Sequence, residues 1–397
     1  MKTERRGKGE RRIGRNEIHI LHVVGARPNF MKVAPVMRAL ERYSATRQSL
    51  VHTGQHYDDN MSRIFFSDLG LPAPTVNLKV GSGSHARQTS EIMVRLESEI
   101  VKRKPDLVLA YGDVNSTVAA ALVCSKLGVL FGHVEAGLRS FDRSMPEEIN
   151  RLLTDQISDF LFTPSLDGNK NLLREGVSKE KIYFVGNVMI DTLVRLLPKA
   201  RARWREPGFF PDITGENLER YGLVTLHRPS NVDEMGLLSS IMRSLNKISR
   251  SLPLVFPVHP RTRKQFESLR FKQSQQLYFS APLSYVDFLA LQCRATLVIT
   301  DSGGIQEETT YLGVPCLTLR KNTERPVTVT KGTNILVGQD MENLLAAVEK
   351  ILKNPHKKRN IPALWDGKAS ERIAKTIIRS RLFARRDMCC SSQTAQW

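Results

Sequence analysis

The sequence predicts an α/β protein with two doubly wound domains of similar size. The chain has 397 residues, which exceeds the usual size of one domain. Short apolar runs alternate with helix-length segments along most of it, a pattern typical of βαβ units and a parallel sheet. The pattern breaks once, near Pro198. Such sheets bind ligands beyond the carboxyl ends of their strands, so we expect the functional site between the two domains.

The first domain is expected to span residues 18–198. An apolar run of strand length, Ile18 to Val24, precedes a helical segment, Phe30 to Glu41. A later strand, Leu107 to Tyr111, precedes a helix from Thr117 to Leu127. The remaining short apolar runs are Val129 to Val134, Phe160 to Phe162 and Ile182 to Val185.

The second domain is expected to span residues 217–368. It follows a linker, residues 199–216, which is polar and contains Pro207-Gly208. Residues 369–384 are predicted to form a C-terminal helix, and residues 385–397 a tail. The apolar runs of this domain are Leu223 to Leu226, Leu254 to Val258, Leu277 to Phe279, Thr296 to Thr300, Cys316 to Leu319 and Ile335 to Val337.

The chain is basic, with 59 Lys and Arg against 40 Asp and Glu and a net charge of +19. Residues 1–17 are rich in Lys and Arg and poor in apolar residues, so they are expected to be a disordered extension. A positive charge favours anionic partners such as nucleotide phosphates, nucleic acid or membrane surfaces. Nucleic acid is disfavoured, because the basic residues are dispersed, aromatic residues make up only 7% and no recognition motif is present.

Signals for a membrane or an oxidising compartment are weak. No stretch approaches the roughly 18 apolar residues of a membrane span, and the basic extension lacks the apolar core of a secretory signal. The five cysteines are too few and too scattered for a disulfide framework. We therefore expect a protein of the reducing cytoplasm, without a membrane span.

Two strand-to-helix turns of the first domain carry charged residues. Arg27 and Lys32 lie in a turn after the first strand, where a helix N-terminus would help them attract an anion. An ordinary turn with surface cations explains the same spacing. Asp113 follows a strand and Gly112, and could be either a proton-transfer group or a helix N-cap.

The segment from Gly132 to Arg151 is the most informative part of the chain. Its Glu135 leaves a strand at the same sheet edge as Asp113, which favours proton transfer in a cleft that holds an anion. A Glu at this place could instead simply pair with an Arg. Glu147 and Glu148 open a helix, where acids complement the dipole, so at least one of them could be structural.

Similar motifs end strands of the second domain. His227 and His259, each beside a cation, end successive strands, which favours a shared anionic ligand over two structural histidines. Ser302, Gly303 and Gly304 lie between a strand and a helix, where small residues let backbone amides approach a diphosphate. Glycines kept only for a tight turn are the alternative.

Two charged residues lie near that loop in the sequence. Glu308 is one turn into the helix, where its carboxylate could accept hydrogen bonds from ribose hydroxyls. Arg325 follows a later strand and could either bind phosphate or pair with Glu324.

Taken together, these motifs resemble those of the non-hydrolysing UDP-N-acetylglucosamine 2-epimerases of bacteria. The resemblance runs from about Ile18 to Arg379. Its ordered motifs are Gly25 to Pro28, Thr53 to Asp58, Val80 to His85, Gly112-Asp113, His133 to Arg139, Pro146 to Arg151, Gly186 to Asp191, His227-Arg228, Asp301 to Glu308 and Glu324 to Pro326.

The resemblance implies two Rossmann-like domains of the GT-B fold, with the active site in the interdomain cleft. It also implies a reaction, the inversion of carbon 2 of UDP-N-acetylglucosamine to give UDP-N-acetylmannosamine. In this family UDP is eliminated to leave a 2-acetamidoglucal and is then added back, with a proton delivered to the opposite face. Neither a cofactor nor a metal is implied.

Site residues follow from the resemblance position by position. Asp113, Glu135 and Glu147 match the acid–base carboxylates, and His227 matches the histidine near the diphosphate. Gln55 and His56 match part of an allosteric substrate site found in some members. The substrate-binding residues expected from the resemblance and the motifs are Arg27, Lys32, His259, Ser302, Gly303, Gly304, Glu308 and Arg325.

The resemblance further implies a cytoplasmic homodimer that acts on a UDP-sugar and supplies polysaccharide biosynthesis. Two related reactions stay open at this point. One is epimerisation of another UDP-2-acetamido sugar, such as a 2,3-diacetamido derivative. The other is a hydrolysing epimerisation that releases N-acetylmannosamine and UDP. A sugar transferase of the same fold is less favoured, because no acceptor site is evident.

Overall fold

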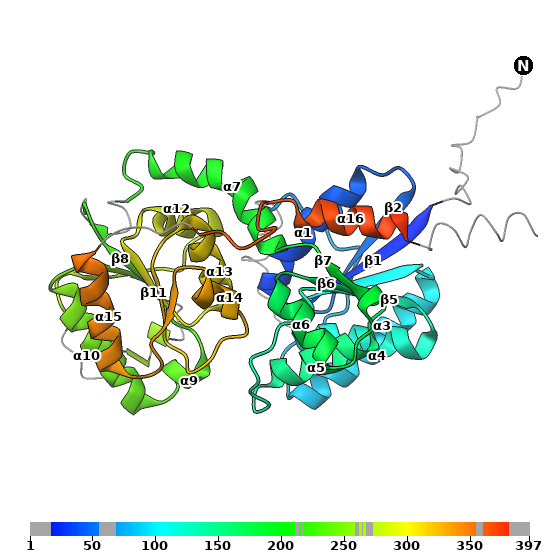
Figure 1. Ribbon diagram of the computed structural model, residues 1–397, viewed down its shortest axis with the longest axis horizontal. Coiled ribbons are helices and arrows are strands. Elements are labelled where there is room, and N and C mark those ends of the chain that lie inside the picture. The colour runs from blue at the N-terminus through cyan, green and yellow to red at the C-terminus, as the bar shows by residue number, and fades with distance from the viewer. Residues whose placement is uncertain are drawn as a thin grey trace, which may run out of the picture.

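Two parallel sheets, each flanked by helices, lie side by side in the computed structural model (Figure 1). Every strand pair is parallel, and each sheet has a point where the strand order reverses. The predicted fold class, two doubly wound Rossmann-like domains, is thereby confirmed. The structure describes residues 17–54, 69–210, 214–215, 218–258, 262–263, 265–266, 273–354 and 360–380.

The sheet of the first half has the order β3-β2-β1-β4-β5-β6-β7. All seven residues of its strand β1 are buried, because helices cover both faces of the sheet. The strands are β1 (Ile18–Val24), β2 (Thr46–His52), β3 (Val76–Asn77), β4 (Leu107–Tyr111), β5 (Leu130–Val134), β6 (Phe160–Thr163) and β7 (Ile182–Phe184).

The helices of this half begin where sequence signals favour a start. Pro28 and Pro146 lie in the first turns of α1 and α5, where the missing N–H costs nothing. Ser84 and Asn187 cap α3 and α7 through side-chain oxygens. The helices are α1 (Arg27–Glu41), α3 (His85–Arg103), α4 (Asn115–Leu127), α5 (Pro146–Ile157), α6 (Leu166–Arg174) and α7 (Val188–Trp204), with a short 3₁₀ turn at Lys179–Lys181.

The sheet of the second half has the order β10-β9-β8-β11-β12-β13. Its strands are β8 (Gly222–Thr225), β9 (Leu254–Pro257), β10 (Leu277–Ser280), β11 (Leu297–Thr300), β12 (Cys316–Thr318) and β13 (Asn334–Leu336). Its helices are α9 (Pro229–Val232), α10 (Met235–Ser249), α12 (Tyr285–Arg294), α13 (Gly303–Leu312), α14 (Pro326–Thr330) and α15 (Met341–Lys353).

The prediction that the linker begins at residue 199 is wrong. Helix α7 continues through Pro198 to Trp204 and packs along α12. Tertiary contacts hold this last turn: Ala200 is fully buried, and the Trp204 ring stacks on Tyr221 with the ring centres 6.2 Å apart. Packing of an apolar face thus overrides the break that proline normally causes.

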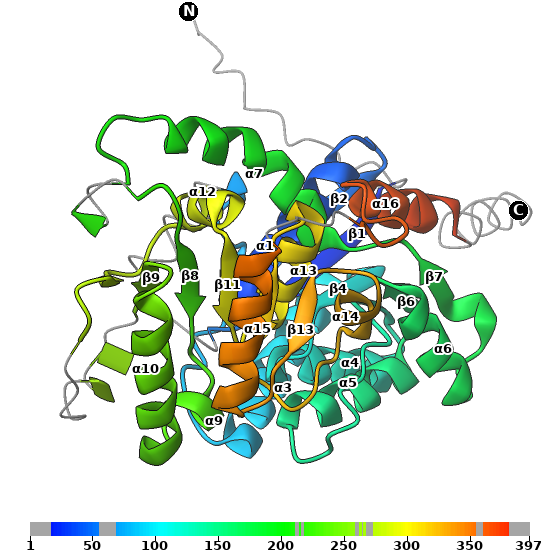
Figure 2. The ribbon, with the colours of Figure 1, turned by 60° about the vertical axis from the view of Figure 1, so that its left-hand side comes forward.

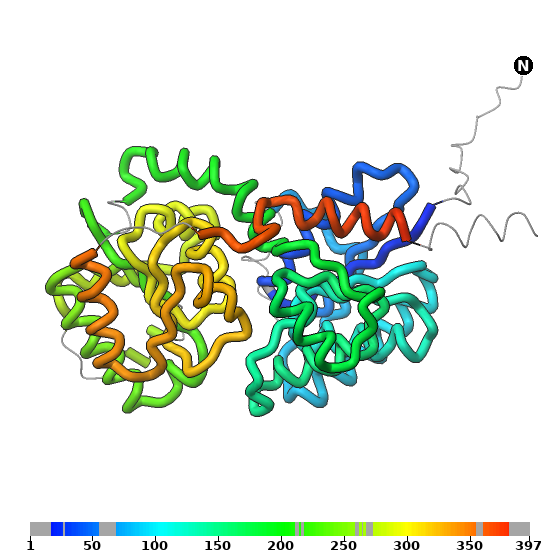
Figure 3. Tube along the Cα trace, in the orientation of Figure 1, coloured from blue at the N-terminus to red at the C-terminus, as the bar shows by residue number. Residues whose placement is uncertain are grey.

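The chain crosses between the halves a second time near its C-terminus (Figures 2 and 3). Helix α16 (Ala369–Arg379) lies against α1 of the first half. Asp191 of α7 caps it by accepting hydrogen bonds from the amides of Ala369 and Ser370, at 3.0 and 2.7 Å. Before α16, the buried Trp365 donates a hydrogen bond to the Pro164 carbonyl.

The reversal points of the two sheets lie where the predicted site residues leave their strands. In the first sheet the order reverses between β1 and β4, and Lys32 and Asp113 follow those strands. In the second it reverses between β8 and β11, which precede His227 and Ser302. A crevice outside the carboxyl ends of the strands is the usual ligand site of such sheets.

Candidate functional site

A cavity of about 340 Å³ lies between the carboxyl ends of the two sheets. Residues of α1, the β4–α4 turn and α5 form its wall on one side, and residues after β8 and β11 form the other. The sequence-predicted residues that line it are Lys32, Asp113, Glu147, His227, Ser302, Gly303, Gly304, Glu308 and Arg325.

Four of the predicted site residues cannot be compared with this cavity. Gln55, His56 and His259 lie outside the described residues, and so does the side chain of Arg27, whose backbone opens α1. The proposed allosteric pair is therefore neither supported nor opposed by the geometry.

Glu135 is buried behind two cations that line the cavity. Its Oε2 is ion-paired with the Lys32 ammonium, and its Oε1 lies 2.8 Å from Nη2 of Arg325. The Glu135 backbone has φ +82°, a left-handed conformation that costs a non-glycine residue about 1–3 kcal/mol. The lack of a side chain at Gly112 leaves space for the Lys32 ammonium, since a Cβ there would lie 2.7 Å from the Lys32 Nζ.

Asp113 lies at the cavity edge, paired with the guanidinium of Arg151. Burial alone would raise its pKa, but the charges of Arg151 and Lys32 hold the pKa of Asp113 below its usual value. The Asn150 amide donates to the Asp113 carbonyl at 2.9 Å and so holds the backbone of the turn. Asp113 is therefore anchored as an anion rather than acting as a helix cap.

The two glutamates at the start of α5 have different surroundings. Glu148 is buried and accepts hydrogen bonds from the amides of Ser140 and Phe141, at 3.0 and 2.9 Å, and from Arg151. Glu147 lines the cavity instead. Glu148 is thus the structural acid of the pair, and Glu147 is the one available to a ligand.

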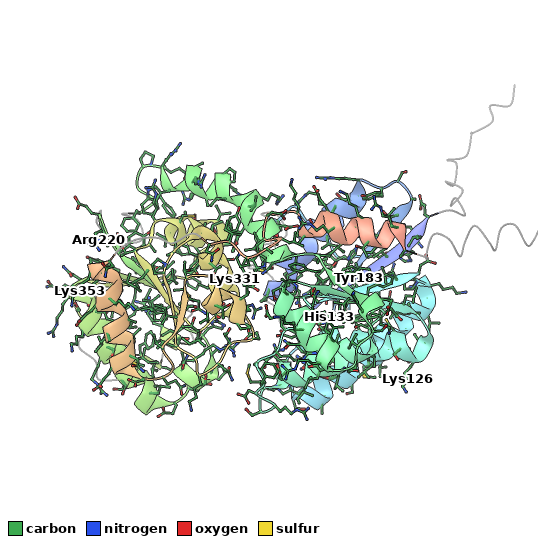
Figure 4. All side chains as sticks on the ribbon, viewed as in Figure 1. Lys126, His133, Tyr183, Arg220, Lys331 and Lys353 are labelled. Carbon is green, nitrogen blue, oxygen red and sulfur yellow. The ribbon has the colours of Figure 1, made fainter. Side chains whose placement is uncertain are left out.

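A series of hydrogen-bonded and ion-paired side chains, most of them buried, supports the turn that carries Asp113. His133, fully buried in the first half (Figure 4), contacts the Gly112 carbonyl through Nε2 at 2.8 Å and Asp155 through Nδ1 at 2.6 Å. Asp155 also forms an ion pair with Arg139, and Arg139 forms a second ion pair with Glu175. His133 and Arg139 of the most informative sequence segment, together with Asp155 and Glu175, position the site without lining it.

His227 is oriented by a buried carboxylate. Asp301 accepts hydrogen bonds from the amides of His227 and Arg228 at 3.1 and 3.0 Å, and lies 3.0 Å from the His227 ring. Burial would raise the pKa of Asp301, but the His227 ring and the hydrogen bonds from the Arg228 amide and the Asn231 side chain lower it overall. The His227 side chain remains 59% exposed, so its ring is free to meet a ligand.

Arg228 is a cavity cation to which motif reasoning assigned no role. Burial, together with the nearby Arg320, lowers its pKa. Within the described ranges its guanidinium has no ion pair, unlike Lys32, Arg151 and Arg325. Its place beside His227 was the signal that could have identified it. A half-buried cation without an ion pair suits an anionic ligand.

Arg325 forms ion pairs with carboxylates. Of the two roles that the sequence left open for it, phosphate binding and pairing with Glu324, the second is observed. It contacts Glu324, which the sequence suggested, and also Glu135 and Glu307. Gly303, expected to let a diphosphate approach, makes room for this guanidinium: a Cβ there would lie 2.4 Å from Nη1 of Arg325. At Gly304 a Cβ would meet only Met189, at 3.7 Å.

Glu308 is held by Tyr285, which no sequence signal linked to it. The Tyr285 hydroxyl donates to Glu308 Oε1 at 2.8 Å. Burial raises the pKa of Glu308 to about 7, and likewise that of Glu307. Glu308 therefore changes charge near neutral pH, whereas Glu307 faces the Arg325 guanidinium at 2.8 Å.

In the described part of the chain, no group of three His, Cys, Asp or Glu residues is arranged to hold a metal ion. No helix in these described ranges is long and apolar enough to cross a membrane.

Comparison with known proteins identifies the family. Residues 38–378 match the profile described as UDP-N-acetylglucosamine 2-epimerase. The UDP-N-acetylglucosamine 2-epimerase of Methanococcus maripaludis is 46% identical over 84% of this chain and 91% of its own. The UDP-2,3-diacetamido-2,3-dideoxy-D-glucuronate 2-epimerase of Pseudomonas aeruginosa is 41% identical over 90% and 99%. A crystal structure of the Methanocaldococcus jannaschii UDP-GlcNAc 2-epimerase with UDP-GlcNAc and UDP has a TM-score of 0.83 at 42% identity, covering 91% of this chain and all of that one.

The raised pKa of Glu308, about 7, predicts a pH-dependent stability. A glutamate in an unfolded chain has a pKa of about 4.3. The stabilising contribution of Glu308 to the free energy of unfolding is therefore fully present at acidic pH and is lost as pH rises through about 7. Relative to the wild type, Glu308→Gln should gain on the order of 2 kcal/mol in free energy of unfolding between pH 5 and pH 8. Urea unfolding at several pH values measures this, with the exposed Glu349→Gln as control. Free energies of unfolding that change with pH in the same way in the wild type and in Glu308→Gln would contradict this prediction.

Proposed function

The chain belongs to the UDP-N-acetylglucosamine 2-epimerase family, and we propose that it is an isomerase that interconverts UDP-N-acetylglucosamine and UDP-N-acetylmannosamine. The observation that carries this function is the cavity between the sheets, where carboxylates and cations of both halves meet the glycine-containing first turn of α13. That arrangement suits a ligand with a sugar at one end and a diphosphate at the other.

The proposed reaction has two stages. The C1–O bond to UDP breaks as the proton on carbon 2 leaves, which gives 2-acetamidoglucal and UDP. UDP then adds back at carbon 1, and a proton reaches carbon 2 from the opposite face. The stages need a base, an acid and positive charge at the departing diphosphate.

We assign proton transfer to Asp113, Glu147 and Glu135. Asp113 and Glu147 come from different elements, the end of β4 and the first turn of α5, and both line the cavity. The lowered pKa of Asp113 keeps its carboxylate deprotonated at neutral pH, the form that can accept a proton. Glu135 is fixed in direction by its ion pairs with Lys32 and Arg325.

The second half is assigned to the nucleotide. Arg228 supplies positive charge, and His227 an exposed imidazole ring, beside the first turn of α13, whose residues Ser302 and Gly304 line the same cavity. A helix N-terminus adds amide donors and partial positive charge for the diphosphate. Glu308, held by Tyr285, is the acceptor proposed for ribose hydroxyls.

The charges of the cavity support a neutral sugar over a uronate. The P. aeruginosa relative is named for a sugar that carries a carboxylate. In this cavity Lys32, Arg151 and Arg325 are each already paired with a carboxylate. Arg228 remains for the diphosphate, so a sugar carboxylate would enter without a cation of its own.

We also propose that the protein forms a homodimer in the cytoplasm. Helices α3, α4 and α5 form an apolar groove of about 580 Å³ that includes Met93, Leu122, Ile149 and Leu153. Ile149 and Leu153 are 39% and 48% exposed, which is unfavourable unless a second copy covers them. Within the described residues no disulfide joins Cys124, Cys293 and Cys316, which supports a reducing compartment.

The function is tested by proton NMR of the purified protein with UDP-N-acetylglucosamine in deuterated water, without added cofactor. We expect deuterium at carbon 2 and a growing signal of UDP-N-acetylmannosamine, because the returning proton comes from solvent. Free N-acetylmannosamine with UDP would assign the hydrolysing reaction instead. An unchanged spectrum, with turnover of the UDP-diacetamido uronate, would assign the alternative substrate.

The assigned acids are tested by Asp113→Asn, Glu135→Gln and Glu147→Gln. Each should lower kcat by roughly 10²–10⁴-fold, the usual effect of a lost general acid or base. The Kd for UDP, from calorimetry, should change less than about threefold, because the nucleotide wall stays intact. Glu342→Gln, on the exposed surface, is the control. Near-wild-type kcat in one variant would remove that residue from the chemistry.

The dimer is tested by Leu153→Arg, which buries a charge in the proposed interface. Light scattering after size exclusion should give twice the chain mass for the wild type and one chain mass for the variant. Leu173→Arg on α6 is a matched control, since Leu173 is also about half exposed at 49%. A wild type that is monomeric at micromolar concentration would refute the homodimer.

A further inference from the structure

The guanidinium of Arg325 is shared among three carboxylates. Its Nη2 lies 2.8 Å from Oε1 of Glu135, its Nε lies 2.8 Å from Oε1 of Glu307, and its Nη1 is paired with Glu324. Arg325 itself is only 7% exposed. Each of its three nitrogens therefore already has an anionic partner, which is a poor starting point for binding a diphosphate.

The three carboxylates come from both halves of the molecule. Glu307 on α13 and Glu324 before α14 belong to the second half, whereas Glu135 follows β5 of the first. Glu324 is further balanced by Arg320 at 2.8 Å. The Arg325–Glu135 pair is thus a buried ion pair between the halves, and breaking such a pair leaves charge uncompensated.

Gly303 provides an independent indication that this arrangement is built into the fold. A Cβ at this position would lie 2.4 Å from Nη1 of Arg325 and 2.7 Å from Oε1 of Glu324. The guanidinium therefore occupies the space that any other residue would fill. The neighbouring Gly304 has no such close contact, since a Cβ there would first meet Met189 at 3.7 Å.

We propose that Arg325 is a positioning residue that holds the carboxylate of Glu135 from the opposite half, and is not a ligand of the diphosphate. This inference rests on the proposed function, in which Glu135 belongs to the acid–base group. Lys32 fixes one oxygen of Glu135 from its own half, and Arg325 fixes the other. The acid–base group is consequently complete only while the two halves are together.

The experiment compares Arg325→Gln with Arg228→Gln. Arg325→Gln should lower kcat by at least about 100-fold, the usual effect of a lost acid or base, and leave the Kd for UDP within about threefold. Arg228→Gln should do the opposite and raise the Kd for UDP at least tenfold, because an unpaired cation facing the ligand is lost. A tenfold weaker UDP affinity in Arg325→Gln would overturn the proposal and make Arg325 a diphosphate ligand.

Gly303→Ala keeps the test decisive if Arg325→Gln does not fold, because it should displace the guanidinium and lower kcat by itself. Where Arg325→Gln does fold, the double variant Gly303→Ala/Arg325→Gln should be no slower than Arg325→Gln alone. Non-additivity of this kind is expected of residues that act through one contact. Additive losses would overturn the link between Gly303 and Arg325. A wild type that binds UDP but does not epimerise would instead refute the proposed function.

Discussion

Glu135 and Glu324 are buried between two sheets, where a carboxylate without a counter-charge costs several kcal/mol. The structure meets this constraint with Lys32, Arg320 and Arg325, whose charges are spent on internal partners. Gly303 accommodates that pairing by lacking a Cβ, and Glu135, which takes part in it, has a left-handed backbone. Buried carboxylates at this site need cations to balance them, and in the proposed function Arg228 is the cavity cation left for the substrate.

Most of the fold could be predicted from the sequence, because strands covered on both faces read as apolar runs. Strands β2 and β3 were missed: β2 begins with the polar residues Thr46, Arg47 and Gln48, and β3 has two residues. The continuation of α7 past Pro198 was also missed, since it depends on Trp204 packing against Tyr221, a contact that no local pattern reveals. Local signals describe elements, whereas tertiary packing decides where some of them end.

The candidate site was predictable where its residues follow strands, because parallel strands bring their carboxyl ends to one edge. That reasoning gathered Asp113, His227 and Ser302 correctly into one cavity. The same reasoning could not distinguish Glu147 from Glu148, because a helix dipole favours an acid at either position. The two glutamates differ in the hydrogen bonds that Glu148 accepts from the preceding loop. Nor could that reasoning find the partners of Arg325, which come from three separate stretches of chain.

The return of α16 to the first half has a consequence for how the protein is made. Ile373, Ala374 and Ile377 of this helix are fully buried, and the helix packs on α1 near the other end of the chain. The ribosome releases the N-terminus first, so the first half lacks part of its cover until α16 has been synthesised. The second half, whose strands and helices are contiguous in the chain, can complete its own sheet earlier. The half that begins first is therefore the one that finishes folding last.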